Sequence, residues 1–110
     1  ATTQSYVEFL REHPGVAALI LRELLDGQGP GQALLRDQGV ALLRKVERWL
    51  RRAAKGELRQ GVPLRAALLE VAFGAMIRQS AGTLREPLWG KGDPTRALAR
   101  ALLLNPPNPG

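Results

Sequence analysis

The most constraining feature of the sequence is the apolar stretch from Pro63 to Gly82, which has no continuous polar side. Proline in the first turn and glycine at the end are typical of a helix with these bounds. Wound as an α-helix, its apolar residues form two nearly opposite stripes: Leu69, Phe73, Met76 and Ile77, and Leu64, Leu68, Val71 and Ala75. A helix that is apolar on two sides must be covered on two sides. Because a chain of this length covers one side easily, we expect the second side to contact another chain.

A line of small residues, Ala67, Gly74 and Ala81, runs along the same stretch at heptad spacing. Glycine inside a helix costs about 1 kcal/mol relative to alanine, and close approach of another helix is the usual compensation. We therefore predict that a partner helix packs against this line. The alternative is that Gly74 makes room for a neighbour within its own chain, such as the last helix.

Composition favours helices over strands, because Ala, Leu, Arg and Glu dominate while Val, Ile and Thr are sparse. The length of 110 residues predicts a single domain over 1–110. The absence of cysteine excludes a disulfide framework and fits a reducing cytoplasm. The chain has no signal peptide and no apolar run near the roughly 20 residues that cross a bilayer, so we expect a cytoplasmic protein without membrane contact.

The periodicity predicts an all-α fold of about five helices in an orthogonal or antiparallel bundle. The expected helices cover about 6–13, 14–25, 32–55, 63–82 and 94–104. Pro14 separates the first two helices, with His13 as a capping or surface residue, and Asp93 is the expected N-cap of the last. Residues 83–92 are expected to be irregular, and 105–110 to be a frayed end.

The third predicted helix has the clearest amphipathic pattern. Its apolar arc comprises Leu35, Leu42, Leu43, Val46, Trp49, Leu50 and Ala53, and its basic arc comprises Arg44, Lys45, Arg48, Arg51, Arg52 and Lys55. The cations could neutralise several phosphates, and the net charge of +6 is compatible with nucleic acid. Yet no aromatic residues interleave with them and no recognition helix is readable, which favours a solvated face. Gly39 lies within the apolar arc, where it permits either a close helix crossing or a break.

Nothing in the sequence gathers the polar groups that an enzyme needs. His13 is the only histidine, so a zinc site would need carboxylates for most of its ligands. Ser5 and Ser80 have no neighbouring base, and the GQGPG loop lacks the lysine of a phosphate-binding loop. We therefore predict no catalytic site, no metal and no cofactor.

An apolar ligand cavity is a second expectation. The bulky residues available to line it are Tyr6, Phe9, Trp49, Phe73 and Met76, together with Trp89. Trp49 belongs to the apolar arc of the third helix, and Phe73 and Met76 belong to one stripe of the central helix. We therefore place the cavity between the third helix and the Phe73 side of the central helix.

The order of elements resembles the C-terminal regulatory domain of TetR-family transcriptional regulators. The resemblance covers roughly 5–104 and rests on an F-L-x-x-H-P break (Phe9 to Pro14), a G-E-L-R turn (Gly56 to Arg59) and two closing helices. It implies a ligand-sensing and dimerisation domain in which the last two helices pair with those of a second subunit. The expected interface residues are Leu64, Ala67, Leu68, Val71, Gly74, Arg78, Ala81, Leu98 and Leu102. The family's N-terminal helix-turn-helix domain is missing from this chain, as expected of an excised fragment.

The expected function is therefore sensing of a small, largely apolar effector by a homodimer that controls DNA binding by a separate N-terminal domain. Two alternatives stay open. One is a structural helical dimerisation module without a ligand. The other is a basic helical domain that binds nucleic acid itself.

Overall fold

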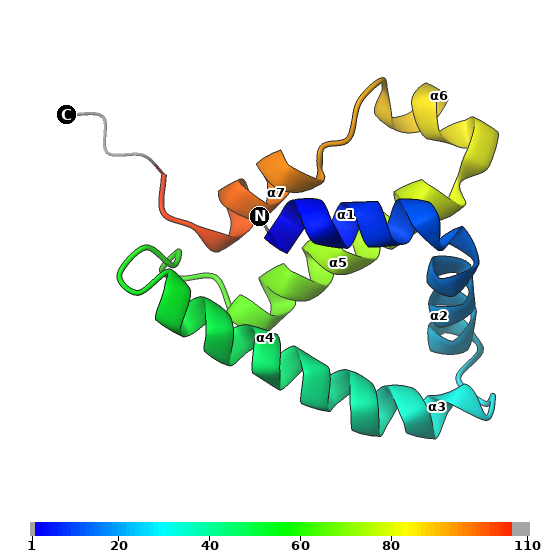
Figure 1. Ribbon diagram of the computed structural model, residues 1–110, viewed down its shortest axis with the longest axis horizontal. Helices are drawn as coiled ribbons and strands as arrows, with labels where there is room; N and C mark the ends of the chain where they lie inside the picture. Colours follow the sequence, from blue (N-terminus) through cyan, green and yellow to red (C-terminus); the bar gives the residue numbers. More distant parts are fainter. Residues whose placement is uncertain (1, 107–110) are drawn as a thin grey trace.

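A computed structural model describes residues 2–106, and the secondary structure of this part is helical apart from one isolated bridge between Leu58 and Leu104 (Figure 1). The helices are α1 (Thr2–Glu12), α2 (Pro14–Asp26), α3 (Gly31–Leu34), α4 (Val40–Ala53), α5 (Leu64–Ser80), α6 (Arg85–Trp89) and α7 (Thr95–Leu103), with a π-helical turn η1 (Leu35–Gly39) and a 3-10 turn η2 (Gly82–Leu84). The predicted all-α class is confirmed. No helix in the described range is long and apolar enough to cross a membrane.

The long predicted third helix is confirmed as a continuous helical run through α3, η1 and α4. Leu35, Gly39 and Val40 all have right-handed helical dihedral angles, so the π-helical turn does not interrupt it. A Cβ placed on Gly39 would meet no atom within 4 Å. Gly39 therefore marks neither a break nor a close helix crossing within the chain.

The predicted break between the first two helices is also confirmed. His13 leaves the helical region, with φ −130° and ψ 61°, and α2 begins at Pro14. The His13 side chain is exposed and makes no capping hydrogen bond, and its ring centroid lies 4.7 Å from that of Phe9. It is thus a surface residue at the N-cap position.

Two predictions near the end of the chain are wrong. Residues 85–89, expected to be irregular, form α6; Pro87 is tolerated there because a first-turn residue needs no intrahelical N–H bond. Asn105, expected to be frayed, donates its N–H to the Glu57 carbonyl at 2.8 Å. The remaining predicted frayed positions from 107 to 110 lie outside the described residues.

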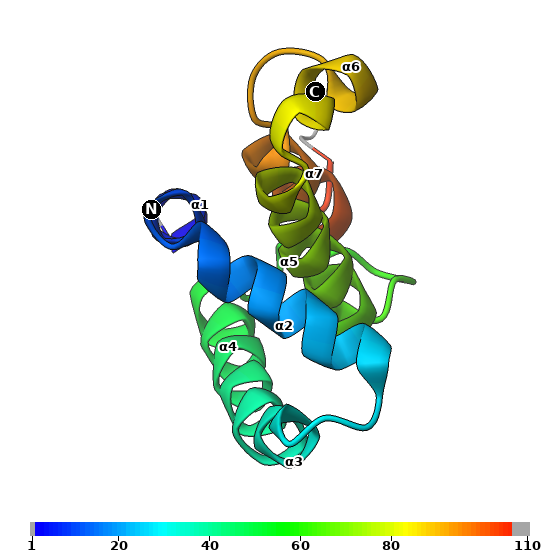
Figure 2. The same ribbon diagram turned by 90° about the vertical axis from the view of Figure 1, so that its right-hand side faces the viewer.

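Helix α5 is the centre of the arrangement. It packs against α1, α2 and α7, whereas α4 approaches it near one end only, where Arg65 and Glu47 form an ion pair at 2.6 Å. Figure 2 shows α1 on one side of the α5–α7 pair, with α2 crossing the lower part of α5. The core cluster of Leu10, Ala17 and Ala75 lies where α1, α2 and α5 meet.

Candidate functional site

The first candidate site is the apolar surface that the chain leaves uncovered. The buried apolar residues of the described part are Val7, Leu10, Val71 and five alanines. The exposed large apolar residues are far more numerous: Phe9, Val16, Leu19, Leu24, Leu25, Leu34, Leu42, Trp49, Val62, Ile77, Leu84, Leu88, Trp89 and Leu98. The core is therefore small, and more large apolar side chains are exposed than are fully buried.

Two stripes of this surface lie on α5 and α7, which pack against each other. On α5, Leu69, Phe73 and Ile77 recur every four residues, and Ile77 is 47% exposed. On α7, Leu98 is 38% exposed and Leu102, one turn later, is half-buried. These two stripes are the accessible apolar part of the two helices that were predicted to dimerise.

The burial of α5 corrects part of the predicted dimer interface. Ala67, Val71 and Arg78 are buried within the single chain, since α2 and α7 cover that side of the helix. Each of the three is at most 9% exposed, so we remove them from the interface. The other predicted interface residues keep some accessible surface: Leu64, Leu68, Gly74, Ala81, Leu98 and Leu102.

Gly74 has a neighbour within its own chain. A Cβ at this position would lie 3.2 Å from Nη1 of Arg78, one turn further along α5. The missing side chain therefore makes room for the guanidinium of Arg78. This favours the intrachain alternative for Gly74, although the neighbour is a side chain of the same helix and not the last helix.

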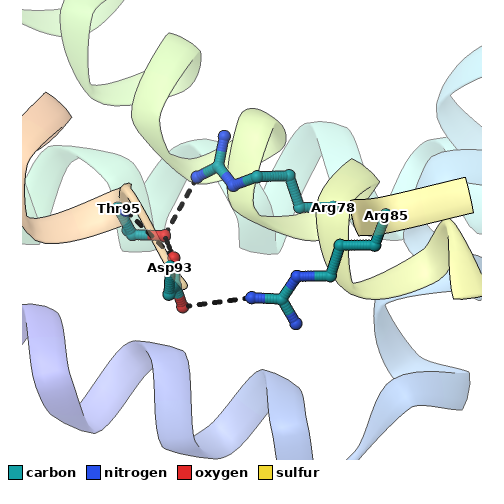
Figure 3. A network of polar contacts seen from close by, with 4 residues as sticks. All are labelled: Arg78, Arg85, Asp93 and Thr95. Carbon is teal, nitrogen blue, oxygen red and sulfur yellow. Dashed lines mark hydrogen bonds and ion pairs between the residues drawn. The ribbon is translucent and has the colours of Figure 1, made fainter. Parts of the chain in front are cut away.

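Arg78 belongs to a buried polar network that joins α5 to the start of α7 (Figure 3). Its Nη2 donates to the Thr95 hydroxyl at 2.9 Å, and this hydroxyl donates to Oδ1 of Asp93 at 2.5 Å. The Thr95 N–H also donates to Asp93 Oδ1, at 3.0 Å, so Asp93 satisfies the N–H of the first residue of α7. Pro94 occupies the N-cap position itself, one residue later than predicted. Nη2 of Arg85 lies 3.8 Å from Oδ2 of Asp93.

Burial, hydrogen bonds and neighbouring charges together set the pKa values of Asp93 and Tyr6 in this region. Burial alone would raise the pKa of Asp93, but the hydrogen bonds from Thr95 and the charges of Arg85 and Arg78 outweigh it and hold this pKa below its ordinary value. Burial raises the pKa of Tyr6 to about 12, against the opposing effect of the Arg78 charge. Tyr6 therefore stays a neutral donor, and its hydroxyl donates to the Ala72 carbonyl at 2.8 Å.

The second candidate site is a groove of about 270 Å³ between the end of α4 and α7. Its lining residues are Trp49, Leu50, Ala53, Ala54, Glu57, Arg96, Ala99, Arg100, Leu103 and Leu104. Most of this lining is apolar, with two arginines of α7 and one glutamate as its charged groups. Such a groove can hold a small apolar molecule, and the arginines can bind an acidic group on it. We call it the Trp49 groove.

The structure separates the predicted ligand-binding residues. Tyr6 and Met76 pack together against the core cluster, whereas Trp49 lines the Trp49 groove. Phe9 is exposed and Phe73 is half-buried on α5. The predicted cavity is therefore corrected at Trp49, because α7, and not the Phe73 side of α5, completes its groove.

Sequence reasoning missed the polar network and the two arginines of the Trp49 groove. Arg96 and Arg100 are spaced one turn apart at exposed positions of α7, a local signal that was available. Comparison of the chain with models of known protein families, with curated proteins and with solved structures gives no match.

Proposed function

We propose that the chain is the effector-sensing and dimerisation domain of a TetR-type transcriptional regulator, with DNA bound by a separate domain. The observation that carries the proposal is the uncovered apolar surface of α5 and α7. The resemblance of the sequence to that family's regulatory domain supplies the functional class.

Surface area supports association with a second copy. The chain exposes 7993 Å², and a folded monomer of 12.0 kDa exposes about 6,000 Å². Its radius of gyration is 15.0 Å, against about 13 Å for a compact domain of this length. A stable interface takes about 800 Å² from each partner, which is less than the excess of about 2,000 Å².

A second copy is the simplest occupant, because the same stripes on two chains can face each other across a two-fold axis. The contact would join Leu69, Phe73 and Ile77 of α5 and Leu98 of α7 to their equivalents. In this arrangement α5 and α7 still pair with the same helices of the second copy, as predicted. The contact is made by the side of α5 that the chain leaves accessible, and not by the side that carries Ala67, Val71 and Arg78.

Dimerisation is tested by placing a charge on the proposed interface. The wild type is expected to sediment as a dimer at micromolar concentration. Ile77→Glu and Leu98→Glu should each raise the dimer dissociation constant about 100-fold, equal to about 2.7 kcal/mol, because the carboxylate would be buried opposite its equivalent.

Leu25→Glu on α2 is the matched control, since Leu25 is 83% exposed and lies outside α5 and α7. Its dissociation constant should stay within twofold of the wild type. A wild type that remains monomeric at tens of micromolar, or a control that dissociates as readily as the interface variants, would contradict the proposed dimer.

The effector site of this proposal is the Trp49 groove. Its apolar walls suit a small, largely apolar molecule, and Arg96 and Arg100 suit a single acidic group on that molecule. The groove volume of about 270 Å³ is just below the roughly 300 Å³ at which ligand pockets begin, so the molecule would have to be small. Effector binding would control the DNA-binding domain by the difference in its affinity for two conformational states.

Anilinonaphthalene sulfonate, an apolar anion, is a suitable probe of this groove. In a Trp89→Phe background, the probe should quench the emission of Trp49, which lines the groove. Arg96→Gln with Arg100→Gln should weaken binding about tenfold, equal to about 1.4 kcal/mol.

Arg22→Gln with Arg36→Gln removes the same charge from exposed positions outside the groove and should change the affinity less than twofold. Equal weakening in both pairs would mean that the probe responds to net charge alone and would contradict the assigned site. Quenching with no dependence on either pair would contradict the role of the arginines.

A further inference from the structure

A second and larger pocket lies where α4 ends, beside the segment that leads into α5. Its volume is about 500 Å³, and residues of α4, of the connection 54–63 and of α7 line it. Three cations take part, Arg51, Lys55 and Arg59, and its described lining includes no acidic residue. Three positive charges without a carboxylate around one pocket favour an anion in it.

The connection that carries these cations is held in place by the end of α7. The Arg59 N–H donates to the Leu103 carbonyl at 2.8 Å, and the Asn105 N–H donates to the Glu57 carbonyl at 2.8 Å. These bonds flank the bridge between Leu58 and Leu104. The pocket is therefore built on a segment with a fixed backbone, which is the condition for a specific binding site.

Arg59 is the best-positioned cation of the pocket. It lines the pocket and is half-buried, whereas Arg51 and Lys55 are exposed. Its backbone N–H is one of the two groups that pair with the end of α7. A cation on a fixed backbone can bind an anion with less loss of side-chain freedom than a cation on a mobile one.

The neighbouring charges do not neutralise the site. Glu47, the acidic residue that approaches the start of α5, is engaged by Arg65, which does not line the pocket. Glu57 lines the Trp49 groove. Pro63 and Leu64, at the N-terminal end of α5, line the pocket, and no side chain caps this end of the helix. Its partial positive charge adds to that of the three cations.

We propose that this pocket binds a small molecule carrying a phosphate group. A guanidinium matches the oxygens of a phosphate with two parallel hydrogen bonds, and Arg51 and Lys55 would supply further charge. The pocket is larger than inorganic phosphate requires, so the ligand is a phosphate ester or a diphosphate. This pocket shares Leu103, but no charged residue, with the lining of the Trp49 groove, and the proposal goes beyond the proposed function.

Calorimetric titration with pyrophosphate, at constant ionic strength, tests the proposal. The wild type should bind, and Arg59→Gln should weaken binding at least tenfold. Arg59→Lys keeps the charge but loses Nε and the planar fork, so it should fall between the two. Circular dichroism spectra must show that each variant keeps the helical content of the wild type, and Arg51→Gln, at an exposed position, should weaken binding even if Arg59→Gln fails to fold.

The matched control is Arg44→Gln with Arg48→Gln. It removes two cations of α4, the helix that carries Arg51, and neither of them lines the pocket. Its affinity for pyrophosphate should stay within twofold of the wild type. Absence of pyrophosphate binding, or equal weakening by the control pair, would overturn the proposal. A parallel titration with a short DNA duplex separates the sources of phosphate: binding of DNA without binding of pyrophosphate would also overturn it and would assign these cations to nucleic-acid contact.

Discussion

Replacing Leu10 by alanine is expected to lower the free energy of unfolding by about 3 kcal/mol. Leu10 is 1% exposed and, with Thr95, is one of the two largest fully buried side chains of the described part. It packs with Ala17 and Ala75, and Tyr6 and Met76 close the cluster. Small alanine side chains cannot collapse into the cavity, so the loss should include both the transfer and the cavity contribution.

Urea unfolding followed by circular dichroism, at one fixed protein concentration, measures this loss. The melting temperature should fall by roughly 12 °C, as about 4 °C or more per kcal/mol is usual for a domain of this size. Leu25→Ala is the control: Leu25 is 83% exposed, so its effect should stay within about 0.5 kcal/mol. A loss below 1 kcal/mol for Leu10→Ala would contradict the assignment of the core to the junction of α1, α2 and α5.

The long helices could be predicted because their signals are local. Pro14 ends one helix and begins the next, and Pro63 precedes the first residue of α5. Apolar periodicity predicts the helical run from α3 to α4, and the predicted C-terminal end at residue 55 differs by two residues from the observed end at Ala53. The same local reasoning failed at α6, where proline and glycine favoured an irregular segment, although Pro87 stands in a first turn that tolerates it.

The role of Arg78 could not be predicted, because its partners lie in a distant part of the chain. An arginine on an otherwise apolar helix is typical of a surface or an interface. Its burial depends on Thr95, 17 residues further along, and on the space above Gly74. At Gly74, the small residue of the heptad line therefore has a steric explanation within the chain, namely the space that the Arg78 guanidinium needs. The periodicity of the sequence does not predict this contact.

The candidate ligand site shows the same limit. The bulk of Trp49 predicts a residue that lines a ligand cavity, but the residues that face it across its groove belong to α7 and to the connection after α4. The position of α7 beside the end of α4 depends on the path of the connection 54–63. Two backbone hydrogen bonds fix that path, one from Arg59 to Leu103 and one from Asn105 to Glu57. Backbone pairing between segments that far apart leaves no periodic signal in a single sequence.

Replacing Thr95 by valine, which has the same shape, is expected to cost about 3 kcal/mol of unfolding free energy. Thr95 is 1% exposed, and its hydroxyl is the side-chain group that receives a hydrogen bond from the buried Arg78. A hydrogen bond to a charged group contributes about 1.5–3 kcal/mol, and its loss leaves a buried donor without an acceptor. Nε of Arg78 already lacks a partner, so the valine variant would leave the guanidinium still less satisfied.

Acid unfolding provides a second reading of the same variant. Asp93 has a lowered pKa in the folded protein, so its contribution to stability is present above its unfolded pKa of about 3.9 and is lost as the pH falls through the folded value. The Thr95 hydroxyl is one of the groups that lower this pKa. Its removal should move the folded pKa of Asp93 upwards, towards the unfolded value, so the part of the stability that is lost between these two pKa values on acidification should become smaller.

Thr95→Ser is the matched control for both measurements. It keeps the hydroxyl and the backbone N–H bond to Asp93, and it removes one methyl group, at a cost of about 1 kcal/mol. Its acid unfolding should follow the wild type. Equal losses for serine and valine, with the same acid unfolding curve, would mean that the hydroxyl contributes nothing; the network from Arg78 to Asp93 would then not be what joins α5 to the start of α7.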